Sequence, residues 1–167
     1  IGKPGSDFYP YPRLVAGTPV SEREPSTRLS NSNWGLRVSK LIAGWDTSAF
    51  YYRSNDISPT LGVNPVSSGL ELTHERIGQF AATFSKDMGR FVLKGEAVHT
   101  HGRSLNTFQG GMLGLQETDM IDYAFGVDIP LKDVWRLNLQ YFARWLDDHD
   151  RLMGVDREER GMTLQLV

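Results

Sequence analysis

Residues 135–145 read Trp135-Arg-Leu-Asn-Leu-Gln-Tyr-Phe-Ala-Arg-Trp145 and alternate between apolar and polar side chains. Successive side chains of an extended strand point to opposite faces. One face would carry Trp135, Leu137, Leu139, Tyr141, Ala143 and Trp145, and the other Arg136, Asn138, Gln140 and Arg144. About 9–11 residues of tilted strand cross a bilayer, and transmembrane barrels have an apolar outer band edged by aromatic residues. The stretch predicts a transmembrane barrel strand or, with its apolar face turned inward, a strand of a soluble barrel.

The composition alone is that of an ordinary soluble domain. The 167 residues carry a net charge of -2, and the mean hydropathy is -0.36. Barrel strands place every second residue in the interior, so average hydropathy does not separate the two classes. The apolar runs span only a few residues, which excludes a transmembrane helix. The charge argues against a nucleic-acid partner, and the absence of cysteine excludes disulfides and thiolate zinc sites.

Tight turns and long connections alternate along the chain. The predicted strands are 33–42, 45–53, 76–85, 90–100, 121–129 and 135–145, with a seventh beginning at 161 and cut off at Val167. The short connections lie near 43–44, 86–89 and 130–133, and the long ones at 54–73, 102–118 and 147–160. Outer-membrane barrels have short periplasmic turns and long extracellular loops. We therefore predict antiparallel hairpins near 33–53, 76–100 and 120–146.

These features predict an all-β, antiparallel, up-and-down transmembrane β-barrel, here a partial barrel of about 6–7 strands. Residues 1–31 contain five of the eight prolines and are predicted to be an irregular extracellular loop, followed by the barrel segment 32–167. Because residue 1 is an isoleucine without a signal peptide and the last strand is cut, we expect a fragment of a longer protein.

The alternation assigns each strand residue to lipid or to the interior. The residues predicted to face lipid are Trp34, Phe80, Phe84, Leu93, Tyr123, Phe125, Trp135, Leu137, Leu139, Tyr141 and Trp145. The residues predicted to line the pore are Arg37, Lys94, Glu96, Asp122, Asp128, Arg136, Asn138, Gln140 and Arg144. A charge at the bilayer midplane costs roughly 2–4 kcal/mol, which favours the interior for these side chains. They either brace the wall through ion pairs or bias which solutes pass, and Asp128 is predicted to lie close to Arg136 or a residue beside it.

Several residues resemble catalytic or metal-binding groups. His99 and His101 have a spacing that suits two metal ligands, and Asp147, Asp148 and Asp150 could supply oxygens to calcium. A third ligand near the histidines and the glycine and distal glutamate of a calcium loop are missing, and no Gly-x-Ser-x-Gly motif occurs. We predict solvated external residues, no enzymatic activity, no metal and no cofactor.

Several stretches together resemble a known family. They are Asn33-Trp-Gly-Leu-Arg37, Asp46-Thr-Ser-Ala-Phe-Tyr-Tyr52, Lys94-Gly-Glu-Ala-Val98 with Gly102-Arg103 after it, and Gly126-Val-Asp128 followed by Trp135-Arg-Leu-Asn-Leu-Gln140. They are similar to the C-terminal barrel portion of large proteobacterial outer-membrane proteins of a domain-of-unknown-function family. The resemblance spans residues 33–167. It implies an outer-membrane barrel tied to export or uptake of hydrophobic compounds, and it supplies no catalytic residue.

The predicted function is passage of small solutes, hydrophobic compounds included, through a porin-like barrel in a Gram-negative outer membrane. The predicted partners are outer-membrane lipids, the remaining strands of the parent barrel and an efflux or envelope transport system. Two alternatives stay open: a soluble, secreted, lipocalin-like barrel that binds an apolar ligand, and a structural or adhesive surface protein.

Overall fold

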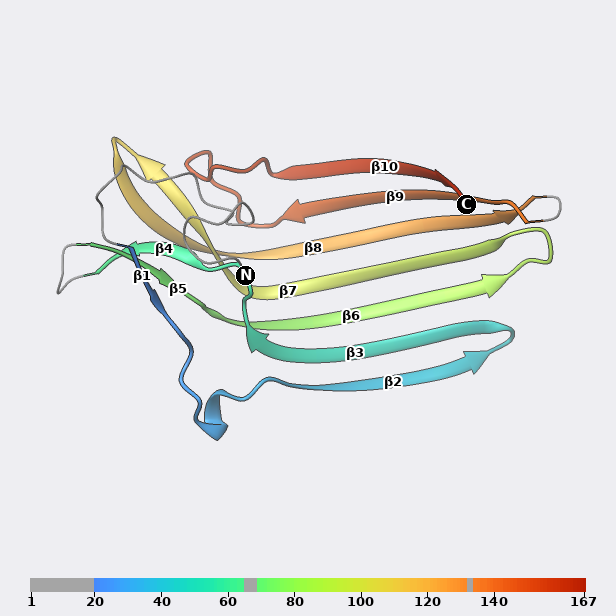
Figure 1. Ribbon diagram of the computed structural model, residues 1–167, viewed down its shortest axis with the longest axis horizontal. Coiled ribbons are helices and arrows are strands. Elements are labelled where there is room, and N and C mark those ends of the chain that lie inside the picture. Colours follow the sequence, from blue (N-terminus) through green and yellow to red (C-terminus); the bar gives the residue numbers. More distant parts are fainter. Residues whose placement is uncertain (1–19, 65–68, 132–133) are drawn as a thin grey trace.

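The computed structural model of the chain describes residues 20–64, 69–131 and 134–167, and these form strands almost throughout (Figure 1). The strands are β1 (Val20–Arg23), β2 (Trp34–Ile42), β3 (Trp45–Asn55), β4 (Thr60–Val63), β5 (Leu70–Thr73), β6 (Arg76–Asp87), β7 (Val92–Gln109), β8 (Met112–Pro130), β9 (Arg136–Leu146) and β10 (Glu158–Leu166). A 3-10 turn, η1 (Leu29–Asn31), precedes β2. The predicted all-β class is therefore confirmed. Within the described ranges no helix is long and apolar enough to cross a membrane.

Seven strands form one antiparallel sheet in the order β10-β9-β8-β7-β6-β3-β2. The three predicted hairpins are confirmed as β2–β3, β6–β7 and β8–β9. Within this sheet, each strand lies beside the one that follows it along the chain, and β6 follows β3 after β4 and β5 have entered the second sheet. This is an up-and-down order. β2 and β10 are the outermost strands at opposite edges, so the described residues form no closed barrel (Figure 1).

Two-residue turns close two hairpins of the large sheet, β2–β3 and β7–β8. Ala43 and Gly44 join β2 to β3 with φ angles of 51° and 79°, and Gly110 and Gly111 join β7 to β8 with 58° and 84°. Positive φ at both central residues matches the twist of the flanking strands. Glycine adopts this conformation without steric cost, whereas Ala43 is strained there. The first turn was predicted at its observed position.

The predicted loop at 102–118 is wrong. β7 and β8 instead run on past the rest of the sheet and stay paired up to Gln109 and Met112. The register shifts between Thr100 and Arg103, where Gly102 has a φ of 77°. This irregularity breaks the alternation of apolar and polar residues, which is why the pattern resembled the end of a strand.

Two other predicted loops contain strands. β4 and β5 lie within the predicted loop 54–73, and β1 lies within the predicted irregular segment 1–31. β1, β5 and β4 form a second sheet in that order, in which β1 and β5 are parallel and β4 and β5 antiparallel. Residues 1–19, 65–68 and 132–133, which include parts of three predicted connections, lie outside the described residues.

The buried apolar side chains gather mainly at one end of the large sheet. The small sheet lies at the end where β7 and β8 extend, and β4 contacts both of these strands (Figure 1). Leu72 of the small sheet is fully buried, and Met120 and Leu146 are paired on β8 and β9. The other buried apolar residues are Leu61, Ile77, Ala81, Ala124, Ala143 and Met153. We call the small sheet of β1, β4 and β5 the cap.

Candidate functional site

The register sorts the strand residues of the large sheet into two faces, because paired residues on neighbouring strands point the same way. All predicted pore-lining residues lie on one face, here called the polar face: Arg37, Lys94, Glu96, Asp122, Asp128, Arg136, Asn138, Gln140 and Arg144. The strand residues predicted to meet lipid lie on the other, the apolar face: Trp34, Phe80, Phe84, Leu93, Tyr123, Phe125, Leu137, Leu139, Tyr141 and Trp145. Trp135 directly precedes β9.

Large side chains on the apolar face are exposed. Leu36 on β2 is 67% exposed, Phe80 on β6 56%, Phe125 on β8 48% and Met162 on β10 77%. Other members of this face are half-buried against their neighbours: Phe84, Leu93, Val127, Leu137 and Leu139. An apolar surface that runs across every strand of a sheet exceeds the patches usual on soluble monomers.

Aromatic rings occur at both ends of the apolar face. Toward the cap, the rings of Trp34 and Tyr51 are 5.4 Å apart. At the opposite end, Trp45 contacts Phe84 with 5.6 Å between ring centroids, and the Lys86 ammonium lies 4.9 Å from the Trp45 ring. Lysine beside an aromatic ring at the rim of an apolar surface keeps its charge in a polar layer while its stem covers the ring.

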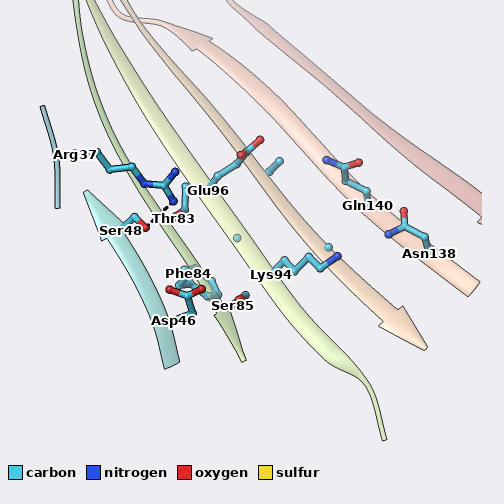
Figure 2. A pocket seen from close by; sticks show the side chains of 13 residues that line it. Arg37, Asp46, Ser48, Thr83, Phe84, Ser85, Lys94, Glu96, Asn138 and Gln140 are labelled. Atoms are coloured by element: carbon cyan, nitrogen blue, oxygen red, sulfur yellow. Dashed lines mark hydrogen bonds between the residues drawn. The ribbon is translucent and has the colours of Figure 1, made fainter. Parts of the chain in front are cut away.

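A groove of about 390 Å³ hollows the polar face (Figure 2). It is lined by Arg37, Lys94, Glu96, Asn138 and Gln140, all predicted to face the interior. It is also lined by residues outside the predicted pore-lining set: Asp46, Ser48, Thr83 and Ser85. The groove holds charges of both signs together with amides and hydroxyls.

Asp128 accepts hydrogen bonds from Lys94 on β7 and Asn138 on β9. Asp128 was expected to lie close to Arg136 or a residue beside it; its hydrogen-bond partner on β9 is Asn138, two residues from Arg136, and all three side chains line the same hollow. The β8–β9 register sets Asp128 opposite Asn138 and Arg136 opposite Pro130. The cation that neutralises Asp128 therefore comes from the strand on its other side, where Val92 is its direct neighbour and Lys94 is two residues further on.

A second ion pair crosses the next two strand boundaries. Arg144 on β9 donates from Nε to Asp122 on β8 at 2.8 Å, and its Nη1 lies 3.5 Å from Glu159 on β10. Near the other edge, Arg37 donates to the Ser48 hydroxyl at 3.0 Å. Neither Asp46 nor Glu96 has an ion-pair partner among the described residues. The groove therefore offers acidic groups that are free to meet a solute.

The cap is fastened to the extended hairpin of β7 and β8. Arg103 contacts Asp56 at 3.1 Å, and the Asp56 side chain is only 7% exposed. Asn106 accepts a hydrogen bond from the Leu61 amide at 3.0 Å and donates one to the Leu61 carbonyl at 2.6 Å, so it continues the edge of β4 like a backbone group. These contacts hold the cap against the extended ends of β7 and β8.

His74 ties β1 to the rest of the cap. Its Nδ1 lies 2.7 Å from the Asp56 carbonyl oxygen and its Nε2 lies 3.0 Å from a carboxylate oxygen of Glu22. Both atoms are acceptors, so only the protonated imidazole donates to both. Burial by itself lowers the pKa of His74, but the hydrogen bonds to Glu22 and Asp56 outweigh it and hold this pKa above its ordinary value.

His99 and His101 both contact Asp119, at 3.5 and 2.8 Å. Their side chains are 46% and 70% exposed. In the part of the chain that the structure describes, no three His, Asp or Glu side chains gather as a metal site would require. Among the three aspartates weighed as calcium ligands, Asp150 accepts a hydrogen bond from the Leu152 amide at 3.0 Å.

The residues that the sequence prediction missed fall into two groups. Asp46 and Ser48 alternate with apolar residues in 45–53, where aromatics on both faces concealed the pattern. Asp56, His74, Arg103 and Asn106 belong to segments that were predicted to be loops or left unassigned, and their contacts span 18 to 47 positions of sequence. Arg103 and Asn106 reach the cap because β7 and β8 extend beyond the sheet. No local signal in the sequence marks that meeting.

Together the fold and the site define an all-β protein with a two-faced, antiparallel up-and-down sheet. Comparison of the chain with protein families, curated proteins and solved structures found no match. Membership of the outer-membrane family named above stays a prediction.

Proposed function

We propose that this chain forms part of the wall of a porin-like outer-membrane β-barrel through which small solutes pass. The observation that carries the proposal is the separation of the two faces: large apolar side chains are exposed on the apolar face of β2, β6, β8, β9 and β10, while the polar face carries cross-strand ion pairs and a groove. Lipid favours such an outer surface, and water inside a barrel favours such an inner one.

The burial pattern distinguishes this proposal from the soluble alternative. A lipocalin-like barrel would bury the apolar face around its ligand. In this sheet, most of the buried residues belong to the polar face instead, among them Ser48, Ala81, Thr100, Ala124 and Asp128. The polar face is thus the more enclosed side, which favours an inward polar face over an inward apolar one.

The groove favours polar solutes. Unpaired carboxylates beside an arginine, two amides and several hydroxyls can hydrogen-bond a solute of mixed polarity, and they select weakly by charge because both signs are present. Passage of hydrophobic compounds, and partnership with an efflux or envelope transport system, rest on the family resemblance alone. We assign the chain no catalytic role.

One feature favours a second role at the cell surface. The hairpin of β7 and β8 projects beyond the sheet, and Phe108 and Met112 beside its tip are 58% and 72% exposed. Such a tip suits contact with another surface molecule.

Tryptophan fluorescence tests the proposed membrane role. All four tryptophans lie on the apolar face or directly before β9. In a variant that keeps only Trp45, we expect brominated lipids to quench the fluorescence strongly after refolding into vesicles. In a matched variant whose only indole comes from Gln140→Trp on the polar face, we expect weak quenching by lipid and strong quenching by aqueous iodide. A chain that stays soluble without detergent and shows no lipid quenching of Trp45 would contradict the proposal.

A further inference from the structure

The two outermost strands of the large sheet each have an unpaired edge. β2 pairs only with β3, and β10 only with β9, each through nine residues in unbroken register. Every residue of β2 is exposed, as is every residue of β10 except Gly161. Along such an edge, alternate backbone N–H and C=O groups point away from the sheet without a partner.

These edges have little of the usual protection against pairing: their charges are Arg37 and Lys40 on β2 and the run Glu158, Glu159 and Arg160 at the start of β10. Proteins that leave an edge open place prolines, bulges or clustered charges along it. Neither strand contains a proline or a register shift, and residues 161–166 of β10 carry no charge. In a bilayer, unpaired backbone groups at an edge cost several kcal/mol each. Both edges therefore require a partner if the sheet spans a membrane.

The partner must have two faces, as these strands do. On β2, Leu36 and Val38 lie on the apolar face and Arg37 on the polar face. On β10, Leu164 lies on the apolar face and Gln165 on the polar face. A strand that continues either edge meets lipid on one side and water on the other, so its side chains must alternate in the same way.

The number of strands in the sheet determines in which direction a strand that pairs with β2 and one that pairs with β10 must run. Neighbours in the sheet alternate in direction, and the sheet has seven strands, so β2 and β10 run the same way (Figure 1). If β2 met β10 directly, the pair would be parallel, both within one chain and between two copies that stand side by side. An inverted copy could pair β2 with β2 in the antiparallel sense, but it would place its cap on the opposite side of the membrane.

We infer that β2 and β10 both pair with a further β-segment that has an odd number of two-faced strands, whose outer strands run antiparallel to both edges. An odd number restores the even total of bacterial barrels. An inverted second copy would satisfy this strand count and direction but would place its cap on the opposite side of the membrane, so we infer a different segment. The inference rests on the proposed function, since it takes the sheet to span a bilayer.

Directional cross-linking tests the inference, because the chain contains no cysteine. Single variants Leu36→Cys and Ile42→Cys mark the two ends of β2, and Glu158→Cys and Leu166→Cys mark the ends of β10. The probe is a synthetic peptide with the sequence of residues 136–146, which is antiparallel to β10 in the sheet, and it carries a cysteine at one terminus. A peptide of the same composition without alternation is the control.

With the protein in vesicles, we expect the peptide with an N-terminal cysteine to form severalfold more disulfide with Ile42→Cys and Leu166→Cys than with the other two variants. The peptide with a C-terminal cysteine should show the reverse preference. The opposite pattern, no excess over the control peptide, or a disulfide between Ile42→Cys and Leu166→Cys of two copies would each overturn the inference. Lipid quenching of Trp45 in the same vesicles reports insertion independently, so failure of the proposed function is seen separately.

Discussion

Asp128 and Asp122 show how the polar face holds charge. Asp128 is 7% exposed and meets Lys94 and Asn138, whereas Asp122 meets Arg144 at 2.8 Å. Hydrogen bonds between ionised partners are stronger than neutral ones, and partial exposure reduces their net contribution. The Lys94 side chain is half exposed, so the pair stabilises the wall moderately.

A double-mutant cycle measures this contribution. We expect Lys94→Ala and Asp128→Ala each to lower the free energy of unfolding, with a coupling energy of about 0.5–1.5 kcal/mol. The measurement is urea unfolding from lipid vesicles. The matched control is the cycle of Asp128→Ala with Arg136→Ala, where we expect losses that nearly add because the two side chains share no hydrogen bond among the described contacts. Equal coupling energies in both cycles would contradict the expectation that Asp128 interacts more strongly with Lys94 than with Arg136.

Glycines paired with aromatic residues explain part of the burial on both faces. A side chain at Gly95 would collide with the ring of Phe84, one at Gly161 with Phe142, and one at Gly35 with Tyr52. In each pair the two residues face each other across neighbouring strands. An aromatic ring that packs over a glycine covers backbone that would otherwise be exposed to solvent. This packing also helps to set the register of the two strands. This contact contributes to the half-buried state of Phe84 on the apolar face.

The cap depends on a few polar contacts between elements that are distant in sequence. Arg103 and Asp56 form a largely buried pair, and His74 holds β1 through Glu22. Removing one partner of a buried pair leaves an uncompensated charge, which costs more than the intact pair contributes. The cap should therefore be the part of the molecule most sensitive to protonation.

Hydrogen exchange tests this sensitivity. Because the pKa of His74 is raised in the folded chain, its contribution is complete below the ordinary value of 6.5 and is lost as pH rises through the raised value. As pH rises above about 6.5 we expect protection of the β1 and β5 amides, corrected for intrinsic exchange rates, to fall, while protection of β9 and β10 stays constant. In His74→Gln, which cannot titrate, this pH dependence should vanish. Its persistence there would assign it to another group.

The elements differ in how well the sequence predicts them. The strand predicted at 135–145 is observed at Arg136–Leu146, because the side chains there, apart from Phe142, follow the two-residue period of a strand with two different faces. The extension of β7 beyond Thr100 was missed because the shift at Gly102 interrupts that period. β4 and β5 were missed because strands of four residues are too short to show a period at all. The two faces were thus predictable, whereas the cap, which depends on contacts between distant segments, was not.

The large sheet combines an apolar face with many exposed side chains and a polar face that holds most of its buried residues, the reverse of a sheet that packs its apolar face into a core. In water, that arrangement is unfavourable by about 25 cal/mol for each Å² of apolar surface left exposed. A bilayer removes this cost. In the part of the large sheet where the inner strands have a neighbour on each side, their length is roughly what crosses a hydrocarbon core. The cap lies beyond this part, beside the extended ends of β7 and β8 (Figure 1).

The depth dependence of a charge on the apolar face tests this arrangement. Phe125 lies in the middle of the stretch of β8 paired with β9, and Ile129 lies on the same face near its end. We expect Phe125→Lys to lower the free energy of unfolding by about 2–4 kcal/mol in vesicles and Ile129→Lys by about 0–1 kcal/mol, because the cost of a charge falls toward the interface. Gln140→Lys on the polar face is the matched control and should cost little.

Bilayer thickness separates lipid from a protein core as the cause. A thinner bilayer brings position 125 closer to the polar layer, so the cost of Phe125→Lys should fall in vesicles of short-chain lipids, whereas the cost of Gln140→Lys should not change. If the apolar face were packed inside a soluble barrel, its charged variants would be destabilised equally in every lipid and also in plain buffer. A cost of Phe125→Lys that is independent of bilayer thickness would therefore favour the ligand-binding barrel, because only lipid against the apolar face makes that cost depend on depth.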